Sequence, residues 1–369
     1  MKKLTNLTLL SALSMLLAVA CESSDPDASA PLGGGGAAGA SAGCPVPTDP
    51  GAGDAPSCQP QSDDYLPAST ATDAWPACIS DDGVFHPFDP NVSSNARTAA
   101  FVEISKKLAF GGGRAPSPQD FIDARVAYSV SEGIESRVAR REDEHYPAAP
   151  KSCRDLAGAE LAAYPDRCVG QNKLQPAINA AFEAGIAGKE PVENAARIEA
   201  ALLWFFYVST HKEARSCADT QADCDSSSGY YAGTQTRGAG EGLAAYVKAA
   251  SPQTHARVWD GLLAVRCWRD LDNPGGLATN FALRDRAAAQ LDRALLRGMA
   301  LVLQHRARNL SCSAAWETVK MIGPLLDREA SLRDPAKAAV IRQEVARASA
   351  TSVDVAALTG ALDAVFACP

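Results

Sequence analysis

The chain has 369 residues and a formal net charge of −8, from 43 acidic and 35 basic residues. Eight of the acidic residues lie in residues 22–75, where Lys and Arg are absent, so the rest of the chain is nearly balanced in charge. A balanced surface does not attract a phosphate backbone, and we therefore expect no nucleic-acid partner.

The first twenty residues are typical of a secretory signal. Lys2 and Lys3 precede an apolar stretch, residues 7–19, which is too short to span a bilayer as a helix. The stretch leads into "LLAVAC", which ends at Cys21. This motif resembles the lipobox of bacterial lipoproteins, in which the cysteine is lipidated and becomes the mature N-terminus. An ordinary secretory signal that happens to adjoin a cysteine is the alternative.

The resemblance implies a signal peptide at residues 1–20 and a membrane anchor of acyl chains, such as palmitate, on Cys21. Glu22 follows, where many inner-membrane lipoproteins have Asp, so the resemblance favours the outer membrane of the cell envelope. Residues 21–75 are rich in Ala, Gly, Ser, Pro and Asp and have too little apolar area to fold. We expect them to form a disordered, lipid-anchored linker ahead of a globular domain at residues 76–369.

Helical signals dominate this domain. Ser117 and Asp120 flank Pro118 as a helix N-terminus, and the helix should continue to about His145, where Pro147 would end it. Residues 194–214 are apolar almost all round between 200 and 208, which predicts a central, buried helix.

The later helices follow the same rules. Ser251 and Pro252 begin a helix that should end before residues 273–275, "NPG", and a long helix is expected at 279–308. Further helices are expected near residues 92–109, 153–163, 171–187, 238–250, 312–329, 335–349 and 352–367. The sequence therefore predicts an all-α, multi-helix bundle, built as one domain or as two packed subdomains.

Besides Cys21 there are ten cysteines, an even number that indicates disulfides in a chain outside the cytoplasm. The sequence does not fix their pairing. The most plausible local pair is Cys217 with Cys224, followed by Cys153 with Cys168. A third pair, residue 44 with residue 58, would close a loop within the linker.

The segment "RREDEHYP" (140–147) carries the strongest hint of metal chemistry. On a helix, Glu142 and His145 would be neighbours in the E-x-x-H spacing of metal-binding bundles. A dinuclear site needs a second E-x-x-H motif, and no other histidine has Glu three positions before it. A mononuclear transition-metal site remains, in which the segment "STHKEA" would supply a third ligand from His211 or Glu213. These two residues are two positions apart and face different directions, so at most one of them would join, and His211 is the residue we assign. A solvated, charged helix end is the alternative interpretation.

The segment 217–233 resembles a calcium loop, but its glycine is one position late and position 12 is Thr234. We interpret it as a disulfide-tied surface loop that contacts a ligand or partner. The aromatic residues 204–207 are interpreted as core. Nucleophile-elbow, zinc-protease and phosphate-loop motifs are absent from the sequence. We therefore favour a protein that is not an enzyme.

Two functions follow. The first is a lipid-anchored binding or interaction protein of the cell envelope, with an unspecified protein or small-molecule ligand. The second is a metal-binding envelope protein, or metalloenzyme, that uses Glu142 and His145. The anchor and helical build resemble helical envelope proteins of the imelysin type, whose G-x-H-x-x-E signature is absent here, so no site residue is transferred from them.

Overall fold

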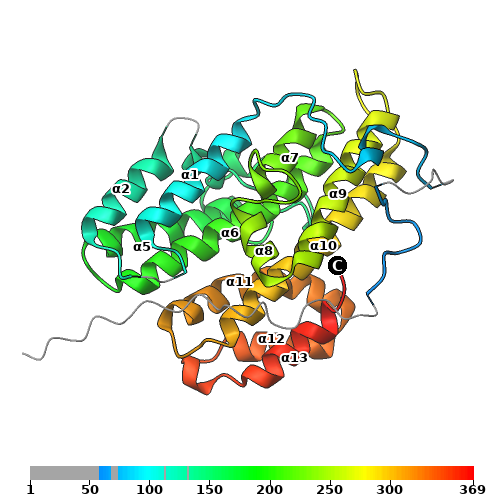
Figure 1. Ribbon diagram of the computed structural model, residues 1–369. Helices are drawn as coiled ribbons and strands as arrows, with labels where there is room; N and C mark the ends of the chain where they lie inside the picture. The colour runs from blue at the N-terminus through cyan, green and yellow to red at the C-terminus, as the bar shows by residue number, and fades with distance from the viewer. Residues whose placement is uncertain (1–57, 68–73, 112–113, 131–132) are drawn as a thin grey trace, which may run out of the picture. The chain divides into compact units, whose positions relative to one another are not determined.

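The computed structural model describes residues 58–67, 74–111, 114–130 and 133–369, and this part of the chain is helical, without a β-strand, as predicted. Figure 1 shows how its helices pack. In chain order they are α1 (Ser93–Leu108), α2 (Pro118–Ser129), α3 (Ile134–Val138), α4 (Gly158–Ala162), α5 (Gln175–Ile186), α6 (Pro191–Ser216), α7 (Ala222–Ala232), α8 (Leu243–Ala250), α9 (Pro252–Leu271), α10 (Phe281–Ala307), α11 (Ser313–Arg333), α12 (Pro335–Val345) and α13 (Val355–Val365).

Helix starts follow the capping signals of the sequence. The Ser117 side chain accepts a hydrogen bond from the Asp120 amide, and the Asp120 carboxylate accepts one from the Ser117 amide, with Pro118 in the first turn. The Ser251 hydroxyl accepts a hydrogen bond from the Thr254 amide at the start of α9. These caps satisfy backbone donors that the first helical turn leaves without partners.

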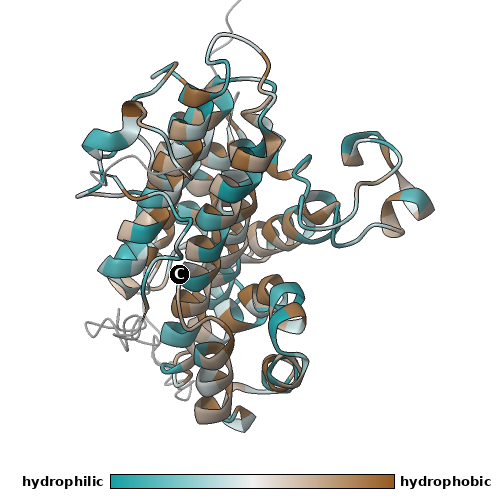
Figure 2. Ribbon diagram, turned by 90° about the vertical axis from the view of Figure 1, so that its right-hand side faces the viewer, coloured by the Kyte–Doolittle hydropathy of each residue, from teal (hydrophilic) through white to brown (hydrophobic). Residues whose placement is uncertain are grey.

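Helix α6 lies at the centre of the fold, as its apolar sequence predicts. Every residue from 200 to 208 is buried, because α6 packs against α5, α7 and α11. Helix α10 packs against α9 and α11 and, less extensively, against α6. Apolar residues of these helices belong to one buried cluster. Hydrophobic and hydrophilic residues alternate along the helical ribbons (Figure 2). The α6–α10 contact matters for function because both helices contribute to the candidate site below.

The expected helix from Ser117 to His145 is wrong. Helix α2 ends at Ser129, α3 ends at Val138, and residues 140–147 are irregular. Just before α3, a Cβ on Gly133 would lie 2.5 Å from the Val130 carbonyl oxygen, so a side chain has no room there. The E-x-x-H spacing therefore falls on a loop, and the helical argument for pairing Glu142 with His145 does not apply.

The surface loop expected at 217–233 is also wrong, because most of it forms the buried helix α7. The Ser227 hydroxyl donates a hydrogen bond to the Thr210 carbonyl oxygen of α6, and Tyr230 and Tyr231 are buried. The apolar area of the two tyrosines is best covered inside the domain, which outweighs the loop-forming composition of the segment.

Four disulfides join described residues. Cys153–Cys168 and Cys217–Cys224 form as predicted, and Cys78 pairs with Cys267. The expected pair between residues 44 and 58 is wrong, since Cys58 pairs with Cys368 and ties the start of the described chain to its end.

Part of the expected linker belongs to the folded domain. The Tyr65 side chain is buried, and its backbone exchanges two hydrogen bonds with the Gln290 side chain of α10. The folded chain thus begins before residue 75. The signal peptide, Cys21 and the rest of the linker lie outside the described residues, as do residues 68–73. Each helix in the described part of the chain is too short or too polar to cross a membrane.

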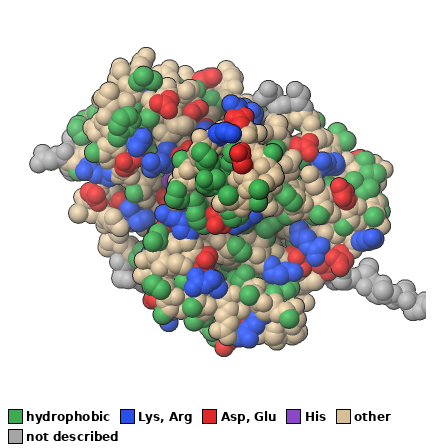
Figure 3. Space-filling model, turned by 180° about the vertical axis from the view of Figure 1, so that it is seen from behind, with side chains coloured by type: hydrophobic (Ala, Val, Ile, Leu, Met, Phe, Trp, Pro, Cys, Tyr) green, Lys and Arg blue, Asp and Glu red, His purple; other side chains and the backbone are tan. Residues whose placement is uncertain are grey.

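On the face shown in Figure 3, Lys and Arg side chains alternate with Asp and Glu side chains. The basic residues do not gather into a single patch on this face. This mixture agrees with the balanced charge of the domain.

Candidate metal centre

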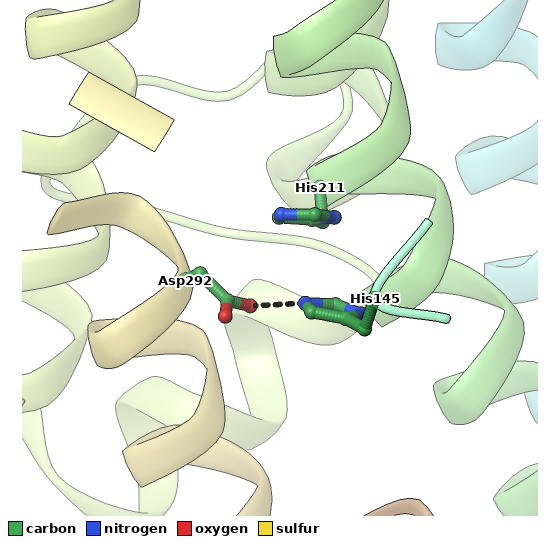
Figure 4. A group of neighbouring side chains, drawn as sticks. All are labelled: His145, His211 and Asp292. Carbon is green, nitrogen blue, oxygen red and sulfur yellow. Dashed lines mark ion pairs between the residues drawn. The ribbon is translucent and has the colours of Figure 1, made fainter. Parts of the chain in front are cut away.

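Three side chains from distant parts of the sequence meet near the C-terminal end of α6. They are His145 from the loop after α3, His211 from α6 and Asp292 from α10. Each offers a ligand atom, and the three atoms lie within 4.8 Å of one another. Figure 4 shows the two imidazoles lying one above the other, with the Asp292 carboxylate facing the edge of His145. We call these three residues the His–His–Asp cluster.

His145 is held at both ring nitrogens. Its Nδ1 lies 2.6 Å from Asp143 Oδ1, and its Nε2 lies 3.2 Å from Asp292 Oδ1. Burial alone would lower the pKa of His145, but the Asp292 charge and the hydrogen bonds of both carboxylates outweigh it and raise the pKa to about 10. At neutral pH the ring is therefore an imidazolium that donates to both carboxylates.

His211 is the opposite case. Its ring stacks on His145 at 4.0 Å between centroids and 20° between planes. Its Nδ1 is buried and has no hydrogen-bond partner in the described part of the chain. Burial lowers the pKa of His211 to about 4, so the ring is neutral at pH 7 and has a lone pair available for a metal.

Asp292 carries its charge into the interior. Burial would raise its pKa, but the two histidines and a hydrogen bond from the Tyr207 hydroxyl, 3.0 Å from Oδ1, hold the pKa below its usual range. Tyr207 thus has a polar role beside the cluster as well as the core role expected from the sequence, since its side chain is buried.

The loop that holds His145 is fixed by contacts outside the cluster. Arg167 donates hydrogen bonds to the backbone carbonyls of Asp143 and Tyr146, at 3.2 Å each. Gly170 passes so close that a Cβ would lie 2.1 Å from the Val138 carbonyl oxygen, and its amide donates to the Arg141 carbonyl. These contacts place His145 without a helix.

Glu142, predicted as a ligand, faces away from the cluster. Its carboxylate pairs with Arg167 at 2.9 Å and accepts the Cys153 amide at 2.8 Å, close to the Cys153–Cys168 disulfide. Its two oxygens are therefore already used in holding the loop. Glu213 pairs with Arg141 at 3.0 Å, as expected for a residue that does not join His211.

The sequence interpretation did not identify Asp292 or Asp143. Asp292 carries a signal that could have revealed it, because it lies four residues from Ala288 and from Leu296 on α10, both of which are buried. An acid within an apolar helical stripe indicates a buried charge that needs a partner. Asp143 lies within the quoted motif, but only the loop conformation turns it toward His145.

The donor set fits a divalent transition-metal ion. Two imidazoles and one carboxylate suit zinc or ferrous iron, and the Asp143–His145 contact is the outer hydrogen bond that orients a ligating histidine. Bringing three ligands about 2.1 Å from one ion requires the stacked rings to turn apart. His145 is fixed at Nδ1, so the unpartnered His211 ring is the one that would move.

Charge supports the same assignment. Asp143 and Asp292 flank one imidazolium, so these three groups together carry one unbalanced negative charge in a buried place. A divalent ion that replaced the His145 proton would leave two positive charges against two carboxylates. The nearby Glu329 pairs with both Arg328, at 3.3 Å, and Arg333, at 2.8 Å.

Comparison with known proteins gives no assignment: no family model, no curated protein and no solved structure matches the chain. The cluster must therefore be interpreted from its own chemistry.

Proposed function

We propose that this protein is a lipid-anchored protein of the cell envelope whose helical domain binds one divalent transition-metal ion at the His–His–Asp cluster. The observation that carries the proposal is the neutral, unpartnered His211 beside the ion-paired His145 and Asp292. Of the two functions that the sequence suggests, the metal-binding one gains a defined site, with Asp292 in place of Glu142.

The space around the cluster favours binding over turnover of an organic substrate. The adjoining cavity, lined in part by Asp143, His145 and Tyr207, holds about 10 Å³. That volume suits about one water molecule, and His145 is the one proposed ligand that lines it. An organic substrate would not fit.

The envelope address rests on two observations. The "LLAVAC" segment supports a lipid on Cys21, and the disulfides of the domain suit an oxidising compartment. Replacement of Cys21 by Ser should release the protein from the membrane fraction. A Cys21→Ser variant that stays with the membranes would contradict the anchor and leave the metal site untouched.

The metal proposal is tested on the full chain with its disulfides formed. Zn²⁺ at a concentration about 100-fold above its Kd should stabilise the domain by about 3 kcal/mol, or roughly 5 °C in Tm. Asp292→Asn and His211→Ala should abolish this shift, whereas Glu142→Gln should keep it. A Tm that does not change on addition of Zn²⁺, Fe²⁺ or Co²⁺ would reject the proposed function. If Glu142→Gln lost the Tm shift while Asp292→Asn kept it, the assigned set of ligands would be wrong.

A further inference from the structure

A second site lies away from the metal cluster, at the end of α7. A cleft of about 430 Å³ opens between the chain that precedes α1, helix α7, the loop at residues 233–238 and Trp259 of α9. In Figure 1 the blue-to-cyan segment before α1 runs past α7 and α9 at this place. The volume lies within the range of small-molecule binding sites.

The lining of the cleft is largely apolar. Val84, Phe85, Pro87 and Val92 contribute from the segment before α1, and Trp259 contributes from α9. Such a lining suits a ligand with an apolar body, because burying that body releases water from both surfaces.

Among the lining residues, one carboxylate oxygen of Asp225 and the indole nitrogen of Trp259 are buried and have no hydrogen-bond partner in the described part of the chain. Asp225 is 3 % exposed; its Oδ2 accepts the Asp89 amide at 2.7 Å, while its Oδ1 accepts no hydrogen bond. Trp259 is 2 % exposed, and its Nε1–H donates none. Buried polar atoms are rarely left without partners, since each costs free energy comparable to a lost hydrogen bond. The pair thus offers one acceptor and one donor.

Charge decides which ligand the acceptor favours. Arg237, the cation among the lining residues, is paired with Asp260 at 2.6 Å. Arg266 lies near Asp225, but its positive charge is shared with Asp270, which lies 3.8 Å away and outside the cleft lining. The carboxylates of Asp225 and Asp89 therefore dominate the field inside the cleft.

We propose that this cleft binds a small organic amine, with its ammonium group bound by Asp225 and its apolar body against Phe85 and Trp259. The metal function is not needed for this assignment, since the cleft shares no lining residue with the cluster. The site also gives the segment 217–233 a ligand-contacting role, through the buried helix α7 in place of a surface loop.

The test uses phenethylamine as the probe and 2-phenylethanol and 3-phenylpropionate as neutral and anionic controls. Binding to the full chain is measured by ligand-observed NMR and calorimetry. The amine should bind at least tenfold more tightly than either control, and Asp225→Asn should remove that preference. Asp219→Asn, at an exposed position just before α7, is the matched control and should bind as the unchanged protein does.

A second variant guards against a folding defect in Asp225→Asn. Thr234 lines the cleft and is exposed, so Thr234→Trp should block the cleft without disturbing the core. Loss of amine binding in Thr234→Trp together with an unchanged Tm would support the assignment. Equal binding of the three probes, no binding at millimolar concentration, or full binding by Asp225→Asn would overturn it.

Discussion

Metal binding at the His–His–Asp cluster should release one proton per ion at neutral pH. The nitrogen of His145 that faces Asp292 is the one that would bind the metal, and it carries a proton because the flanking carboxylates raise the pKa of His145 to about 10. The ion must displace this proton. His211 has none to lose, since its pKa is lowered to about 4.

The size of the effect follows from the distance between pH and pKa. At pH 7, about three pH units below the pKa of His145, removing this proton costs about 4 kcal/mol. This cost weakens metal binding roughly a thousandfold in Kd. Each pH unit from 6 to 9 should therefore tighten binding about tenfold. A histidine with an ordinary pKa of about 6.5 would give almost no change over the upper part of this range.

Calorimetry in two buffers with different ionisation enthalpies gives the proton count directly, and titrations at pH 6, 7, 8 and 9 give the slope. Asp143→Asn keeps the three ligands but removes one of the carboxylates that hold the proton, so its slope should flatten at lower pH than in the unchanged protein. A Kd that is constant from pH 7 to pH 9, with no proton released, would refute the reasoning.

The remaining predictions concern stability and are read from chemical denaturation. Gly261→Ala should destabilise the domain by about 1–3 kcal/mol despite the better helix propensity of Ala, because the added Cβ would lie 2.5 Å from the Leu291 Cα. Gly360→Ala has nothing within 4 Å of the added Cβ and should stabilise the domain by about 0.5–1 kcal/mol. Equal effects of the two substitutions would contradict the packing of α9 against α10. Arg141→Met should cost about 3 kcal/mol, because it removes the buried partner of Glu213 and leaves that carboxylate only the partly exposed Lys212. Adding Glu213→Leu should recover most of that loss. An Arg141→Met variant as stable as the unchanged protein would show that the ion pair does not matter.

Local signals in the sequence predict the helices well, because capping residues and apolar stripes act within one or two turns. Ser117, Ser251 and the all-apolar stretch of α6 each give the element that they indicate. The loop at residues 140–147 could not be predicted in this way. Its conformation depends on Arg167 and Gly170, which lie more than twenty residues away in the chain.

The candidate site shows the same division. The E-x-x-H spacing points to His145, residue type points to His211, and the structure brings the two rings together. Helical spacing also points to Glu142. That spacing places Glu142 beside His145 only on a helix, and α3 ends at Val138, before both residues. Asp292 comes from α10, and only the packing of α10 near α6 places it beside the histidines. Long-range contacts of this kind leave no fixed spacing in a sequence.

The most direct test of the metal centre is the zinc K-edge X-ray absorption spectrum of the full chain loaded with Zn²⁺. We predict two imidazole ligands and at least one oxygen at about 2.0–2.1 Å, with no sulfur, and no zinc retained by His211→Ala. A chain that retains no zinc for the measurement, or a spectrum with fewer than two imidazoles, would contradict the assignment of His145, His211 and Asp292.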